Sequence, residues 1–141
     1  MERGWQVTAI DTDRAALTTL RSIPRLTVVA TDVRDYADDR SFNLVVCTWV
    51  LHFLPADDVG PMIERIKRWT APGGSVVITV YSTRNEPGKR PYLFAPGELA
   101  AAFVGWMIEL DEAKPTPWFM KPGEVNARRN HALYFVARND R

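Results

Sequence analysis

Cysteine and histidine are scarce in this chain of 141 residues, which contains one cysteine, Cys47, and two histidines, His52 and His131. A single cysteine excludes an internal disulfide, and so few nitrogen and sulfur ligands exclude the usual zinc sites. We therefore expect no metal centre. Because Cys47 lies in an apolar run, we interpret it as a packing residue.

Long apolar runs and clusters of one charge are also missing. No apolar stretch approaches the roughly 18 residues that a membrane span needs, and no signal peptide opens the chain. The net charge is +1 and the basic residues are scattered, so nothing indicates a nucleic-acid or membrane partner. With 46% hydrophobic and 25% charged residues, we predict one cytoplasmic domain over residues 1–141.

The most informative stretch is FNLVVCTWVLHFL at residues 42–54. It opens with a nearly continuous apolar run, which is typical of a parallel strand buried on both faces. Aromatic and polar residues follow directly, and an open α/β sheet places its ligand at the carboxyl ends of such strands. This stretch therefore predicts a small-molecule site.

Strand and helix patterns alternate along most of the chain, followed by two strands in succession. This order predicts an α/β sheet that is mostly parallel and ends in an antiparallel hairpin. Helices are expected after Asp13, from Pro55 to Trp69 and at 97–103. Strands are expected at 5–11, 26–30, 42–48, 75–81, 106–112 and 131–138, with long connections at 82–96 and 113–130.

Four segments, in this order and spacing, resemble a class I S-adenosylmethionine-dependent methyltransferase with a Rossmann-like sheet. Within that superfamily the chain is most similar to the tellurite-resistance and thiopurine-type branch of small-molecule enzymes. The segments are GWQVTAID at 4–11, TDV at 31–33, FNLVVCTWVLHFLP at 42–55 and APGGSVVITVYS at 71–82.

The resemblance implies S-adenosylmethionine as the cofactor and places residues around it. Asp11 would accept hydrogen bonds from the ribose hydroxyls and Asp32 from the adenine amino group. Each has a simpler interpretation, since Asp11 could cap a helix and Asp32 could be a solvated loop acid. The expected cofactor-binding residues are Asp11, Thr12, Asp32, Val33, Thr48 and Trp49.

The methyl acceptor is expected near His52 and Phe53, with Trp118 and Phe119 from the later connection. A lone histidine after an apolar strand is more often structural, which is the alternative for His52, whereas exposed aromatic residues in a long loop, such as Trp118 and Phe119, require a reason. No catalytic residue is assigned, because the sulfonium cofactor carries an activated methyl group and the protein mainly positions a nucleophile.

The chain departs from the resemblance at its start. The family opens with a first strand and a loop of the type D-x-G-x-G-x-G, and neither is present here. That strand would lie between those at 5–10 and 43–48, so its absence leaves unpaired backbone groups. We favour a truncated start; direct closure of the two strands or pairing within a homodimer are the alternatives.

The acceptor and the activity are open at this stage. The tellurite branch uses a histidine–arginine pair between the last two strands, where this chain has Pro117 to Met120, so a more apolar acceptor is expected. A nicotinamide-binding Rossmann half is a rival interpretation. Another is an inactive methyltransferase-like domain that serves as a binding module.

Overall fold

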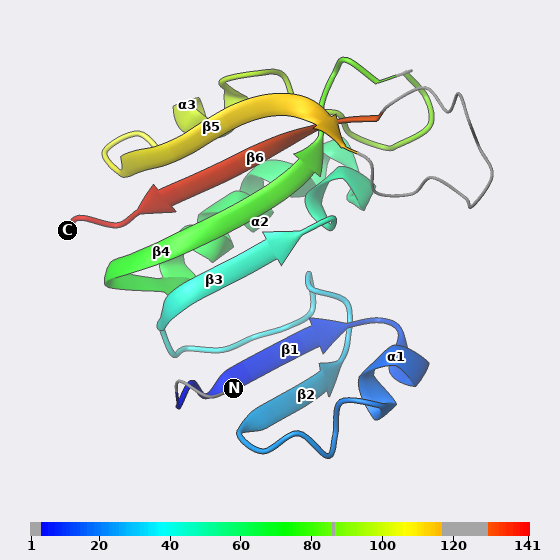
Figure 1. Ribbon diagram of the computed structural model, residues 1–141, viewed down its shortest axis with the longest axis vertical. Coiled ribbons are helices and arrows are strands. Elements are labelled where there is room, and N and C mark those ends of the chain that lie inside the picture. Colours follow the sequence, from blue (N-terminus) through cyan, green and yellow to red (C-terminus); the bar gives the residue numbers. More distant parts are fainter. Residues whose placement is uncertain (1–3, 86, 117–129) are drawn as a thin grey trace. The chain divides into compact units, whose positions relative to one another are not determined.

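Two separate sheets organise the chain, and the computed structural model describes residues 4–85, 87–116 and 130–141. The described strands form a two-stranded sheet, β1-β2, and a four-stranded sheet, β3-β4-β6-β5 (Figure 1). They belong to two compact units, Met1–Asp39 and Arg40–Arg141. That residues 1–141 act as one domain remains a prediction.

The first unit consists of two parallel strands and a short helix. Asp13 ends the turn after β1 and caps the helix, because its Oδ1 accepts the N–H groups of Ala15 and Ala16 at 2.9 and 3.0 Å. Leu17 is the buried residue of that helix. The elements are β1 (Val7–Asp11), α1 (Arg14–Thr18) and β2 (Leu26–Ala30).

The second unit contains the mixed sheet. β3 runs parallel to β4, whereas β6 is antiparallel to both β4 and β5. The predicted α/β class and the closing hairpin are therefore confirmed. The strands are β3 (Phe42–Thr48), β4 (Thr70–Tyr81), β5 (Met107–Thr116) and β6 (Asn130–Arg138).

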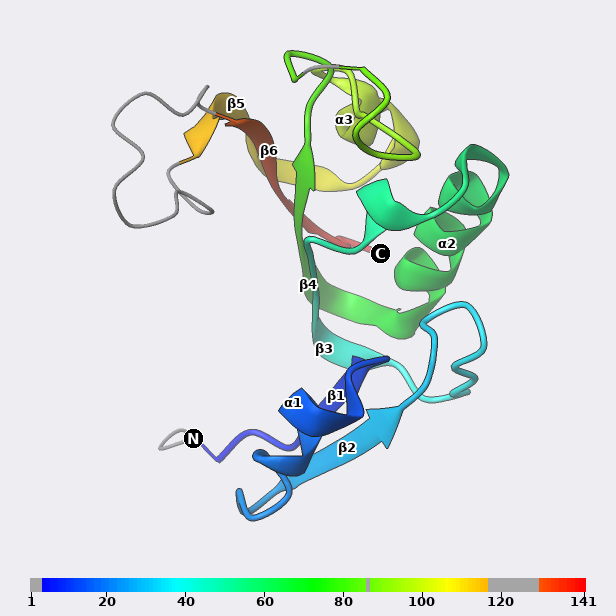
Figure 2. The same cartoon turned by 90° about the vertical axis from the view of Figure 1, so that its right-hand side faces the viewer.

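The helices of this unit cover one face of its sheet (Figure 2). They are η1 (Leu51–Phe53), α2 (Ala56–Trp69) and α3 (Glu98–Ala102). Helix α2 buries Val59, Met62, Ile63 and Ile66, which recur at helical spacing. Opposite pairs on β4 and β6, such as Ile78 with Phe135, complete the core. No helix among the described residues has the length and apolar character needed to cross a membrane.

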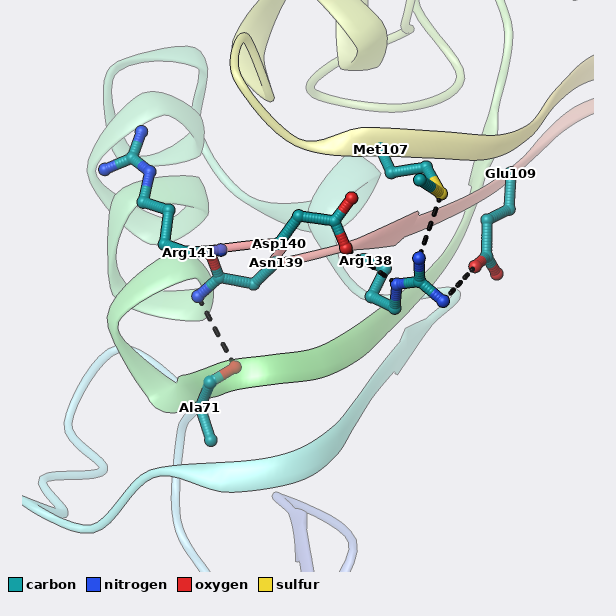
Figure 3. A network of polar contacts seen from close by, with 7 residues as sticks. All are labelled: Ala71, Met107, Glu109, Arg138, Asn139, Asp140 and Arg141. Atoms are coloured by element: carbon teal, nitrogen blue, oxygen red, sulfur yellow. Dashed lines mark hydrogen bonds and ion pairs between the residues drawn. The ribbon is translucent and has the colours of Figure 1, made fainter.

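The start of β4 differs from the prediction. We expected residues 71–74 to separate helix from strand, but β4 begins at Thr70 and these residues bulge between two paired positions. Asn139 holds the bulge in place, because its N–H donates to the Gly74 carbonyl at 2.8 Å and its carbonyl accepts the Gly73 N–H. Its side-chain amide also donates to the Ala71 carbonyl (Figure 3).

The strand ladders are described within each unit separately. Within the described residues, β1 pairs only with β2 and β3 only with β4. A truncated start, direct closure of β1 on β3 and pairing within a homodimer all remain predictions, because each strand ladder lies within one unit.

Candidate functional site

Two carboxylates lie at the carboxyl edge of the β1-β2 sheet. Asp11 is the last residue of β1 and is paired with Ala30, the last residue of β2. The Thr31 N–H donates to the Asp11 carbonyl at 3.0 Å, and Asp32 follows immediately. Because the two strands are parallel, both acids are brought to the same edge, as the sequence predicted.

The Asp11 carboxylate is exposed and only partly engaged. Its Oδ1 accepts the N–H of Asp13 at 2.9 Å, and the helix cap itself is Asp13. The interpretation of Asp11 as the cap of α1 is therefore wrong. Thr12 lies exposed between these two acids. An ionised carboxylate offers about four acceptor sites, so Asp11 retains room for hydroxyl donors.

Asp32 is held by Arg34. The Arg34 backbone N–H and Nε donate to Oδ1 at 2.8 and 3.0 Å, and Nη2 donates to Oδ2 at 2.8 Å. These hydrogen bonds lower the pKa of Asp32 to about 2, so the group stays ionised at neutral pH. Oδ2 keeps a lone pair for one further donor, and Val33 lies half-buried beside it.

The second unit presents another set of predicted residues, where β3 ends. Thr48 is exposed and pairs with Thr79 of β4. Trp49 then has a φ of 61°, and its N–H donates to the Thr79 carbonyl at 2.8 Å. A bulky residue in the left-handed region is uncommon, and such conformations concentrate at functional sites.

Aromatic rings surround His52 directly after this turn. The His52 ring is fully buried and lies 4.5 Å from the Tyr81 ring, 4.3 Å from Phe53 and 6.0 Å from Trp49 between centroids. Burial, together with the charge of Arg90, lowers the pKa of His52 to about 4. The imidazole is therefore neutral at pH 7. Phe53 remains 55% exposed.

Sequence reasoning missed three residues of this cluster. Tyr81 ends β4, and Arg90 and Tyr92 come from the segment 82–96, which we interpreted only as a long loop. The Tyr92 N–H donates to the His52 carbonyl at 3.3 Å, and the Arg90 guanidinium lies 4.7 Å from the Tyr81 ring centre. An arginine among aromatic residues, RPYLF at 90–94, was the available signal.

The structure thus groups the predicted residues in two sets, one in each unit. Asp11, Thr12, Asp32 and Val33 belong to the first unit, and Thr48, Trp49, His52 and Phe53 belong to the second. Trp118 and Phe119 lie outside the described residues.

The family model described as a methyltransferase domain matches residues 1–78. The chain belongs to the methyltransferase domain family. No curated protein matches the sequence.

Solved structures of methyltransferases share the fold. TehB from Haemophilus influenzae is similar over 96% of this chain and 50% of its own, with a TM-score of 0.84 and 19% identity. The 1,6-didemethyltoxoflavin-N1-methyltransferase of Burkholderia thailandensis, solved with S-adenosylhomocysteine, is similar over 99% of this chain and 64% of its own, with a TM-score of 0.72 and 24% identity. This methyltransferase domain thus spans about half to two thirds of these proteins.

A third similar structure is the N-methyltransferase NodS from Bradyrhizobium japonicum in complex with S-adenosylhomocysteine. It is 16% identical, with a TM-score of 0.74, over 95% of this chain and 66% of its own. The family and the two complexes agree with the cofactor expected from the sequence, S-adenosylmethionine. The residues present also fit this cofactor, because the carboxylates of Asp11 and Asp32 accept hydrogen bonds from hydroxyl and amino groups.

Proposed function

We propose that this protein transfers a methyl group from S-adenosylmethionine to a small-molecule acceptor. The observation that carries the proposal is the pair of carboxylates, Asp11 and Asp32, at one edge of a parallel sheet in a chain of the methyltransferase family. Their acceptor oxygens suit the ribose hydroxyls and the adenine amino group. Thr12 and Val33 lie next to them and would line the same part of the cofactor.

Methyl transfer from S-adenosylmethionine requires little general acid or base catalysis by the protein. When bound, the sulfonium cofactor supplies an activated methyl group. Asp11 and Asp32 would hold the adenosine, and Thr48 and Trp49 the amino-acid part. His52 and Phe53 would orient the acceptor and exclude water, which is how positioning lowers a barrier. His52, neutral at pH 7, adds no charge beside a cationic donor.

The proposed acceptor is a small organic molecule. This agrees with the exposed aromatic ring of Phe53, which suits an apolar or planar group. Trp118 and Phe119 remain proposed substrate residues on the sequence pattern alone. Tellurite is not proposed, since the region between the last two strands has no histidine and has Arg128 and Arg129 only near its end.

The first experiment is isothermal titration of the purified protein with S-adenosylhomocysteine, together with its mass in solution. Micromolar binding is expected, and a dimer mass would favour the homodimer considered above. A folded protein that binds no S-adenosylhomocysteine would overturn the proposal and favour an inactive binding module.

The role of Asp11 is tested by Asp11→Ala. Loss of the charged acceptor should weaken S-adenosylhomocysteine binding by about 1.5–3 kcal/mol. The matched control is Asp39→Ala, which removes an exposed acid of the same unit and should leave the affinity unchanged. Equal affinities for the two variants would remove Asp11 from the site.

A further inference from the structure

Two buried hydrogen-bond donors in the second unit have no partner among the described residues. They are Nε2 of His52 and Nε of Arg90. Buried polar atoms in folded proteins almost always have a partner, so each exception requires an explanation. Two such atoms in one cluster suggest a ligand that supplies the missing acceptor.

The hydrogen bonds of His52 determine which atom donates. Its Nδ1 accepts the backbone N–H of Tyr81 at 3.4 Å. In a neutral imidazole one nitrogen accepts and the other carries the proton, so Nε2 is the N–H. The group that is left unsatisfied is therefore a donor, and it needs an oxygen or another acceptor.

Arg90 adds a positive charge that no described carboxylate neutralises. Its Nη1 donates to the Lys89 carbonyl at 2.8 Å, and its guanidinium lies 4.7 Å from the Tyr81 ring centre and 5.5 Å from that of Phe53. The cation lies over these rings, which accept none of its in-plane N–H bonds. The Nε–H of this guanidinium thus lacks an acceptor, which an oxygen of a planar ligand group would supply.

The two donors border one aromatic ring. The His52 ring lies 4.5 Å from that of Tyr81, and the Arg90 guanidinium lies over the same ring. Arg90 is half-buried whereas His52 is fully buried, so a ligand from solvent meets the guanidinium first. The exposed ring of Phe53 provides an apolar surface beside it.

We propose that Arg90, with His52, forms a carboxylate-binding site beside Phe53 and Tyr81. The ligand chemistry is a carboxylate attached to an apolar or planar body, and a guanidinium binds it through two parallel hydrogen bonds. The inference rests on the proposed function, because the carboxylate belongs either to the methyl acceptor or to the amino-acid part of the cofactor.

If the carboxylate belongs to the methyl acceptor, benzoate should bind better than its neutral analogue benzamide, which NMR titration of the Phe53 and Tyr81 amide signals measures. If it belongs to the cofactor, S-adenosylhomocysteine should bind better than methylthioadenosine, which lacks the carboxylate, and calorimetry measures this. The variant is Arg90→Gln and the matched control is Arg84→Gln, an exposed arginine of the same segment. Thermal unfolding checks that each variant is folded.

In at least one pair, benzoate with benzamide or S-adenosylhomocysteine with methylthioadenosine, we expect the ligand that carries the carboxylate to bind more tightly. Arg90→Gln should reduce this ratio of affinities roughly ten- to hundredfold. Arg84→Gln should retain it. No preference in either pair, or a preference that survives Arg90→Gln, would overturn the inference. If S-adenosylhomocysteine binds equally to all variants while benzoate does not bind, the carboxylate site is overturned and the proposed methyl transfer still stands. If benzoate preference depends on Arg90 and no S-adenosylhomocysteine binds, the carboxylate site stands and methyl transfer fails.

Discussion

At the scale of single residues, His52 links the stability of the protein to pH. Its pKa is lowered to about 4, first by burial, which removes water from the imidazolium, and then by the charge of Arg90. An exposed histidine in the unfolded chain has an ordinary pKa of 6.5. Between these two values the unfolded chain binds a proton that the native protein does not.

We therefore predict that the contribution of His52 to stability is complete above pH 6.5 and lost as the pH falls to about 4. Its upper limit is about 3 kcal/mol. Denaturant unfolding at pH 7.5 and pH 4.5 measures the difference. His52→Gln should reduce the loss between these pH values, whereas His131→Gln should leave it as in the parent. The same loss in all three proteins would contradict the assignment.

At the scale of elements, the bulge at the start of β4 depends on Gly74. A Cβ at this position would lie 2.9 Å from the Ala71 carbonyl oxygen, 3.0 Å from that of Phe42 and 3.1 Å from that of Asn43. All three are backbone atoms of the paired strands, so they cannot move without disturbing the ladder. The glycine is required by close approach rather than by a positive φ.

Gly74→Ala should therefore destabilise the protein by about 1–3 kcal/mol, as overpacking does elsewhere. The matched control is Gly60→Ala in α2, where a Cβ meets nothing within 4 Å and alanine favours the helix by roughly 0.5–1 kcal/mol. Denaturant unfolding of both variants measures the free energies. Equal effects of the two substitutions would contradict the packing argument.

Elements defined by local pattern were predictable from the sequence. β2 (Leu26–Ala30) has the predicted bounds, and α2 buries the residues that its spacing indicated. Contacts between residues far apart in the sequence were not predictable from it. Tyr92 bonds to His52 forty residues earlier, and Asn139 holds the bulge of β4. No short-range periodicity encodes such pairs, so the Arg90 cluster and the true start of β4 were missed.

At the scale of the whole molecule, the two units differ in how much core they contain. In the described part of Met1–Asp39, the buried apolar side chains are Leu17 and Tyr36, whereas the other unit buries many apolar residues of α2, β4 and β6. A two-stranded sheet with so little buried apolar area is marginally stable in water. Its backbone hydrogen bonds should open more readily than those of the larger sheet.

Amide hydrogen exchange should therefore be fast in β1 and β2 and slow in β4 and β6.

Ligand binding should change this exchange. If Asp11 and Asp32 bind the cofactor, S-adenosylhomocysteine at a hundred times its dissociation constant stabilises the folded state by about 2.7 kcal/mol. Exchange in β1 and β2 should then slow by up to roughly a hundredfold. The same ligand concentration should protect Asp11→Ala much less. Equal exchange in both sheets of the free protein would contradict the difference in core, and unchanged exchange in β1 and β2 at saturating ligand would contradict a site at their carboxyl ends.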